Sequence, residues 1–265
     1  MITYRDFVAA FRRLGLGESS RILAHASLSA FGEVAGGAET VVGAMVGTFD
    51  SVMMPAFTLR TMVVPSVGPS NNAITYDHEP GQNELAEFFQ PEMAADRSVG
   101  VVSETLRKHP EASRSHHPIL SFTGVNSASF LEAQSLEDPL ALVGRLADAD
   151  GDVLLLGVDH RADAAIHYAE QQARRHQFTR WALTPRGVVE CPNFPGCSDG
   201  FMQVQDRLSG IRRHTELGSA RLESVPLRDL IHLTSAWIRQ EPLALLCDRP
   251  SCPRCSAVRA VVEVY

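Results

Sequence analysis

A chain of 265 residues can bury a large core, and its hydrophobic content of 45% and charged content of 21% are ordinary for a folded protein. The formal net charge of −7 argues against nucleic acid or an anionic membrane as a partner, because both call for a basic surface, and it permits a cationic small molecule. No apolar stretch reaches the roughly 18 residues of a membrane span, and the amphipathic N-terminal segment lacks signal-peptide features, so we expect a cytoplasmic protein.

The first 175 residues alternate between helix and strand patterns, which is typical of an α/β protein. A turn rich in glycine at residues 32–37 and a long loop or lid at residues 65–82, rich in Pro, Asn, Ser and Gly, interrupt these patterns. In chain order we expect a helix over residues 1–17, a strand over 20–26, a helix over 38–49, a strand over 51–56, helices over 83–89 and 100–108, a strand over 121–124 and a helix over 127–134.

A buried strand followed by a helix is the most informative pattern of the chain. The run VLLLGV at residues 153–158 has the composition of a buried strand, and residues 162–175 are compatible with a helix and contain no proline. His167 and Glu170 lie three residues apart and therefore share one face of that helix. The sequence thus predicts an imidazole and a carboxylate just beyond the end of a buried strand, where α/β proteins place their active sites. An ordinary ion pair on the helix surface is the alternative.

The pattern changes after residue 175. We expect a hairpin over residues 178–191, a helix over 201–217 and a strand over 257–265. The sequence therefore predicts a main α/β lobe over residues 1–175 and a smaller, partly β, cysteine-bearing lobe over residues 176–265. The smaller lobe is expected to contribute to the ligand site and to return to the main sheet at the C-terminus.

All five cysteines lie in this second part of the chain. Disulfides are disfavoured in the cytoplasm, and the C-x2-C spacing with a second pair upstream favours a structural zinc site. Cys247 follows the apolar run LALL, so we assign it as a buried bystander. Free thiols on adjacent loops are the alternative. The expected zinc ligands are Cys191, Cys197, Cys252 and Cys255.

Five short motifs occur in a fixed order: HASLS at 25–29, MPAFT at 54–58, GVVSE at 100–104, RSHHP at 114–118 and LLLGVDHRADAAIHYAE at 154–170. Together they resemble the motifs of the aminoglycoside 3-N-acetyltransferase family, and the resemblance covers residues 3–175. It implies an α/β fold whose topology differs from that of the common acetyltransferases. It also implies acetyl transfer from acetyl-CoA directly to an amine of an aminoglycoside, usually at the 3-N position, and hence a role in antibiotic resistance.

The chemistry of amine acetylation needs a group that accepts a proton, since a protonated amine cannot attack a thioester. An imidazole titrates near neutral pH, and His167 matches the family's essential histidine, so we expect it to be the general base. Glu170 can orient that ring or hold the substrate's ammonium group, and we expect substrate contact with electrostatic support. Backbone N–H groups, Ser27 or Ser29 could stabilise the oxyanion.

The remaining site residues follow from the same resemblance. Turns at helix N-termini and cations suit phosphates. A solvent ion pair is the alternative for Arg114, and we favour a core imidazole for His25. Residues expected to bind acetyl-CoA are Ser27, Leu28, Ser29, Gly36, Gly37, Thr58, Arg114, Ser115 and His117. Residues expected to bind the substrate amine are Asp77, Glu79, Glu84, Asp163 and Glu170.

Two departures from the family pattern put the acceptor in question. Asp163-Ala164-Ala165 replaces the usual Asn-Thr-Thr, and Arg161 stands where an acid is usual. An acetyltransferase acting on a different amine is therefore a second hypothesis. A non-catalytic protein that binds a small molecule is a third. A metal-dependent hydrolase is a fourth, in which His25, His116, His117, His160 and His167 would converge with Asp159 or Asp163.

Overall fold

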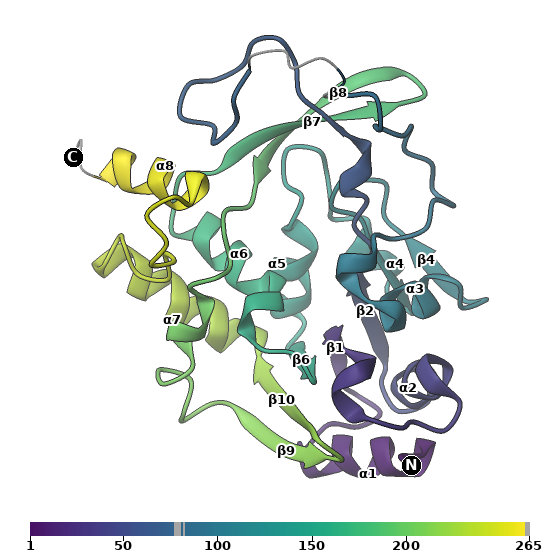
Figure 1. The fold of residues 1–265 in the computed structure, drawn as a ribbon. Helices are drawn as coiled ribbons and strands as arrows, with labels where there is room; N and C mark the ends of the chain where they lie inside the picture. The colour runs from purple at the N-terminus through teal and green to yellow at the C-terminus, as the bar shows by residue number, and fades with distance from the viewer. Residues whose placement is uncertain (77–80, 82, 263–265) are drawn as a thin grey trace.

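The centre of the computed structural model, which describes residues 1–76, 81 and 83–262, is a seven-stranded mixed sheet (Figure 1). Its strand order is β4-β5-β2-β1-β6-β10-β9. The central strand β1 pairs in parallel with β2 and β6, and the other neighbours pair antiparallel. The carboxyl ends of β1, β2 and β6 therefore share one edge of the sheet. The strands are β1 (Arg21–Ala26), β2 (Ser51–Pro55), β4 (Ala112–Arg114), β5 (Phe122–Val125), β6 (Asp152–Leu156), β9 (Arg213–Leu217) and β10 (Ala220–Pro226).

Helices cover both faces of this sheet, which is why its central strands are mostly apolar. Ile22 and Ala24 of β1 pack into the hydrophobic core on one face, and Leu23 packs into the core on the other. The first face carries α1 (Tyr4–Arg13), α2 (Gly37–Val46) and α3 (Val101–Arg107). The second carries α4 (Ala128–Leu131), α5 (Ala141–Asp148), α6 (Ala164–Gln172) and α7 (Leu227–Gln240).

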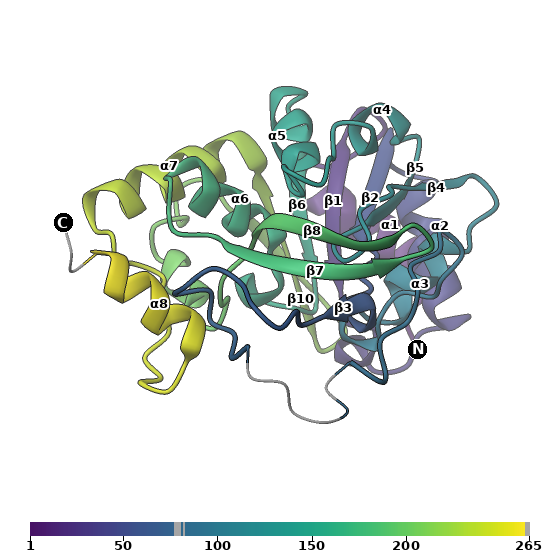
Figure 2. The ribbon, with the colours of Figure 1, turned by 90° about the horizontal axis from the view of Figure 1, so that it is seen from above.

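A small antiparallel sheet crosses above the carboxyl edge of the parallel strands (Figures 1 and 2). It consists of β3 (Met62–Val63), β7 (Phe178–Thr184) and β8 (Gly187–Phe194). Residues of β7 and β8 share a third hydrophobic core with the C-terminal helix α8 (Pro253–Val262). Short 3-10 helices lie at η1 (Leu28–Phe31), η2 (Leu59–Thr61), η3 (Arg97–Val99), η4 (His160–Ala162) and η5 (Phe201–Val204).

The α/β class is confirmed, as are the elements expected up to residue 56 and from residue 100 to residue 194. The helix expected over 83–89 is wrong, because these residues form a turn and irregular structure. Residues 201–217 begin with η5 and end in β9, which gains its stability from pairing with β10. None of the helices in the described part of the chain has the length and apolar character that a bilayer crossing requires.

The end of the chain differs most from expectation. Residues 257–262 belong to α8, whose first residue is Pro253, a residue that favours the first helical turn. Cys255 and Val258 lie on one face of α8 and are buried in the third core, so packing overrides the β propensity of the valines. After residue 176 the chain returns to the main sheet through β9 and β10, and β3 of the small sheet comes from the part of the chain before residue 175.

Candidate active site

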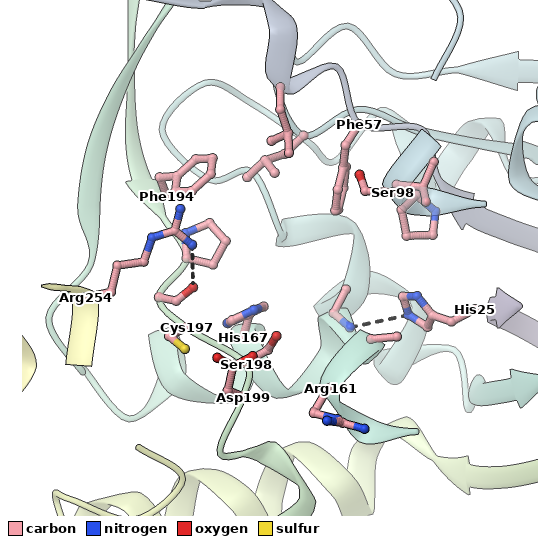
Figure 3. A pocket seen from close by; sticks show the side chains of 18 of the residues that line it. His25, Phe57, Ser98, Arg161, His167, Phe194, Cys197, Ser198, Asp199 and Arg254 are labelled. Atoms are coloured by element: carbon pink, nitrogen blue, oxygen red, sulfur yellow. Dashed lines mark hydrogen bonds between the residues drawn. The ribbon is translucent and has the colours of Figure 1, made fainter. Parts of the chain in front are cut away.

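A pocket of about 580 Å³ opens beyond the carboxyl ends of the three parallel strands. His25 at the end of β1, Pro55 at the end of β2 and Val158 after β6 line it, together with His167 of α6 (Figure 3). The opposite wall is formed by the loop after β8 and by the start of α8. This is the edge at which open α/β sheets bind their ligands.

The connection from β6 to α6 is fixed by local backbone chemistry. Gly157 has a positive φ of +67°, and a Cβ there would lie 2.5 Å from Cβ of Ala30, so only glycine fits the turn. Asp163 caps α6, because its Oδ1 accepts a hydrogen bond of 2.9 Å from the backbone N–H of Ala165. The preceding N–H, that of Ala164, donates to Nε2 of His25 at 3.4 Å. These bonds set the direction in which α6 presents its side chains.

His167, Glu170 and Arg175 form a linear chain of hydrogen bonds. Nδ1 of His167 lies 2.8 Å from Oε2 of Glu170, and Oε1 of the same carboxylate accepts from Nη1 of Arg175 at 2.8 Å. Arg175 also donates to the carbonyls of Pro242 and Ala244. The side chains of Glu170 and Arg175 are each 3% exposed, whereas that of His167 is 15% exposed and lines the pocket.

This arrangement determines what each group can do. A carboxylate only accepts hydrogen bonds, so Glu170 holds the proton on Nδ1 of His167 and leaves Nε2 with its lone pair. Within residues 1–76, 81 and 83–262, no group hydrogen-bonds to Nε2. His167 is therefore oriented as a base. Since both oxygens of Glu170 are engaged and buried, the geometry favours orientation of the ring over the substrate contact that we expected from the sequence.

A second buried network lies beside the first. His160 bridges two carboxylates, with Nδ1 3.2 Å from Asp163 and Nε2 3.0 Å from Glu223. Burial alone would lower the pKa of His160, but the hydrogen bonds to both carboxylates outweigh it and raise the pKa to about 9. Arg212 and Arg221 complete the network through Glu223. The charged imidazole thus ties the cap of α6 to β10.

The pocket lining also contains charged residues, of which Asp199, Arg249 and Arg254 lie outside the sequence motifs. Arg161 pairs with Asp159, and Arg249 pairs with Asp199. Arg254 donates to the carbonyl of Gly196 at 3.1 Å and lies over the ring of Phe194. The described lining thus carries three arginines and one carboxylate, that of Asp199, and most of these charges lie on the wall opposite the sheet (Figure 3).

His25 also lines the pocket, where burial lowers its pKa to about 4. It is neutral near pH 7 and accepts a hydrogen bond from α6. The five histidines that a metal-dependent hydrolase would use do not gather at one site in the described part of the chain. His116 and His117 line a different cavity, and the only group of three or more possible metal ligands in the described ranges consists of cysteines.

The residues expected to bind acetyl-CoA fall in four places, all outside the described lining of the main pocket. Leu28 lies in η1, and the hydroxyls of Ser27 and Ser29 are 3.1 Å apart. Gly36 and Gly37 start α2. Thr58 is buried and donates to the carbonyl of Pro118. A second cavity of about 490 Å³ is lined by Arg114, Ser115 and His117.

The acids expected to bind the substrate amine are also dispersed. Asp77 and Glu79 lie outside the described residues. Glu84 is exposed and is not among the described residues that line the pocket. Asp163 is 1% exposed and uses both of its oxygens, one as the helix cap and one toward His160. Both oxygens of Asp163 are thus engaged within the protein.

The cysteines cluster, but with a different membership. The sulfur atoms of Cys197, Cys247, Cys252 and Cys255 all lie within 4.8 Å of one another. Cys191, which we expected as a ligand, is not in this group. It is fully buried in the third core, and burial raises the pKa of its thiol to about 12. Cys247, which we expected to be a buried bystander, belongs to the group in place of Cys191. The loop after α7 carries Cys247 back to the start of α8, where Cys252 and Cys255 lie.

The sequence of this chain is similar to those of known acetyltransferases. Residues 23–239 match the model of a family described as aminoglycoside 3-N-acetyltransferase. The chain is 31% identical over 270 residues to aminoglycoside N(3)-acetyltransferase VII of Streptomyces paromomycinus, covering 89% of this chain and 90% of that protein.

The chain belongs to the aminoglycoside 3-N-acetyltransferase family. Two solved structures share its fold at lower identity. AAC-IIIb in a binary complex with CoASH has a TM-score of 0.73 and 22% identity, covering 90% of this chain and 96% of that one. A variant of aminoglycoside acetyltransferase AAC(3)-IVa in complex with a gentamicin has a TM-score of 0.74 and 21% identity, covering 98% and 97%.

The extent of the family match separates two parts of the site. Residues 23–239 include the ends of β1 and β2, the whole of α6 and the loop after β8. The match ends before Cys247, Cys252 and Cys255. This acetyltransferase therefore carries its histidine and glutamate within the matched region, and completes its pocket with a C-terminal segment outside it.

The charged state of His160 predicts a pH dependence of stability. Its pKa rises from 6.5 to about 9 on folding, so its contribution is complete below pH 6.5 and is lost as the pH rises through 9. The free energy of unfolding should fall by on the order of 2–3 kcal/mol across this range. Urea unfolding at pH 6.5 and pH 9.5 measures it, with His160→Gln as the comparison. An equal fall in both proteins would contradict the assignment.

Proposed function

We propose that this protein transfers the acetyl group of acetyl-CoA directly to an amine of an aminoglycoside, at the 3-N position, with His167 as the general base. The observation that carries the proposal is the imidazole of His167, held by Glu170 and presenting Nε2 to the pocket. Membership of the family supports the reaction type. The relatives that hold CoASH and a gentamicin support a site for each of the two substrates.

The nitrogen of an ammonium group must lose two protons to become an amide nitrogen. The first is released to solvent, and Nε2 of His167 takes the second as the neutral amine attacks the carbonyl carbon of the thioester. The C–N bond forms, and the electron pair of the carbonyl moves to oxygen. When the carbonyl re-forms, the C–S bond breaks and the thiolate of CoA leaves, and the imidazolium can return the proton to it. Glu170 balances the positive charge of that imidazolium, and Arg175 keeps the carboxylate in place.

The charged wall opposite the sheet suggests how the substrates divide the pocket. Arg254 is held by a backbone carbonyl and a ring, so its charge is not offset by a carboxylate within the described ranges. Cations of this kind bind phosphate, and we assign this wall to the anionic part of acetyl-CoA. Asp199 is the carboxylate in the described lining that could meet an ammonium group.

A second acceptor class has a specific observation in its favour. An aminoglycoside carries several ammonium groups, whereas the described lining carries three arginines and one carboxylate. A smaller amine with fewer charges would suit this lining. Release of CoA measured against a panel of aminoglycosides and simple polyamines decides between the two. Binding of acetyl-CoA with no turnover on any amine would instead favour a non-catalytic binding protein.

Replacing His167 with alanine should lower kcat by about 10² or more, the contribution expected of a general base. The melting temperature should change little, because the ring lies at the pocket wall. His232→Ala, on the exposed face of α7, is the matched control and should leave kcat unchanged. Turnover of the His167 variant at the wild-type rate would remove this residue from the mechanism.

Replacing Glu170 with glutamine tests orientation against substrate contact. If the carboxylate orients His167, kcat should fall by about tenfold or more while KM for the acceptor stays within about twofold. Thermal stability should also fall, because Arg175 loses its buried partner. The opposite result, a raised KM for the acceptor at an unchanged kcat, would assign Glu170 to the substrate. Steady-state kinetics with each substrate varied separately distinguish these outcomes.

Replacing Arg254 with methionine should raise KM for acetyl-CoA several-fold, since a phosphate contact on the order of 1–3 kcal/mol is lost. Arg254→Lys keeps the charge but loses the planar guanidinium group, so its KM for acetyl-CoA should lie between those of the wild type and Arg254→Met. An effect confined to KM for the amine would place the acceptor, rather than the cofactor, at this wall. Isothermal titration of CoA provides the same comparison without turnover.

A further inference from the structure

Four cysteines from three separate segments meet beside the pocket. Cys197 lies in the loop after β8, Cys247 in the loop after α7, and Cys252 and Cys255 at the start of α8. The sulfur atoms all lie within 4.8 Å of one another, and three of the four residues are buried. Cys255 also accepts a hydrogen bond of 3.4 Å from the backbone N–H of Cys247.

The geometry matches what a zinc ion requires. Zinc bound by four thiolates at about 2.3 Å in a tetrahedron places the sulfur atoms about 3.8 Å apart, within the spread observed. The group consists of thiols alone, and zinc prefers thiolate ligands over the oxygen ligands that magnesium and calcium need. A four-cysteine set leaves no open coordination position, which is the character of a structural site.

We propose that Cys197, Cys247, Cys252 and Cys255 bind one structural zinc ion that fixes the wall of the pocket opposite the sheet. Cys197 and Cys252 themselves line the pocket. Their neighbours in the chain include Asp199, Arg249 and Arg254, which give that wall its charges. A single ion therefore links the loop after β8 to the C-terminal helix at the point where both contribute to the pocket.

The polar contacts between the loop after β8 and α8 are few, although β8 and α8 also pack together in the third hydrophobic core. Arg249 pairs with Asp199, but their side chains are 66% and 47% exposed, and a surface pair of this kind stabilises little. Arg254 adds one hydrogen bond to Gly196. The metal would supply the strong link between segments that lie about fifty residues apart in the chain. Three of the ligands lie outside residues 23–239, the stretch that the family model matches.

The metal content of cysteine variants tests the site, and Cys191 provides the matched control. Protein purified under reducing conditions without chelators should hold about one zinc ion per chain by elemental analysis. Cys247→Ser and Cys255→Ser should lower zinc occupancy at limiting metal at least about tenfold, since even an outer partner of a metal ligand is worth 10- to 100-fold in affinity. Cys191→Ser should keep the full amount. Loss of zinc from Cys191→Ser with retention in Cys247→Ser would overturn this ligand set.

A measurement on the wild-type protein covers the case in which a variant fails to fold. Cobalt in place of zinc should show the intense charge-transfer absorption of a tetrathiolate site, and titration with a mercurial should consume four thiols for each metal ion released. Wild-type protein that takes up neither metal under reducing conditions, or that has already lost these thiols to disulfides, would overturn the proposal.

The effect on the pocket wall has its own readout. Removal of the metal by a chelator should increase amide hydrogen exchange in residues 195–199 and 249–254, and leave exchange in α6 unchanged. The KM for acetyl-CoA should rise, although His167 and Glu170 of α6 stay in place. Unchanged exchange in both loops after metal loss would show that the ion does not hold this wall. The metal, thiol and exchange measurements do not depend on which amine the enzyme acetylates.

Discussion

The buried carboxylate of Glu170 is the interaction on which the site depends. A carboxylate removed from water is costly unless it is paired and fully hydrogen-bonded, and here each oxygen has one charged or polar partner. Arg175 is buried on the far side and is itself held by carbonyls that follow α7. The imidazole on the near side therefore cannot rotate freely. Its position is set by the packing of α6 against α7 rather than by the pocket.

The sequence was most informative where structure is local. The apolar run of β6, the turn after it and the i,i+3 spacing of His167 and Glu170 all follow from residues close together in the chain, and the structure contains them as expected. Arg175 could not be assigned in this way, because its role depends on carbonyls at residues 242 and 244. The exchange of Cys191 for Cys247 has the same origin, since only the path of the loop after α7 brings Cys247 to α8. Residues 257–262 were expected to form a strand because their valines favour one. They are helical because they pack in the third core, and that packing depends on residues distant in the sequence.

The surroundings of Ala164 and Ala165 show what the alanines at these two positions, in place of the threonines of the family motif, do to the pocket. Ala165 is fully buried in the core beneath α6, so a larger side chain there would have to displace its neighbours. Ala164 lines the pocket, and a hydroxyl at that position would face the ligand. The pocket floor of this chain is therefore less polar than the family pattern implies. With His25 neutral beside it, the sheet side of the pocket offers few groups for a polycationic substrate.

The two walls of the pocket differ in how they are kept in place. The sheet side is built from strand ends and a capped helix, and paired backbone groups and buried side chains hold it rigid. The opposite side is built from the loop after β8 and the start of α8, and loops lack such pairing and open at low cost in free energy. In the proposed reaction, the imidazole positioned by the first wall is effective only if the second wall holds the thioester against it at a constant distance. The metal ion proposed at the base of the second wall would meet this need with four side chains, at the point where the third core borders the charged residues of the pocket.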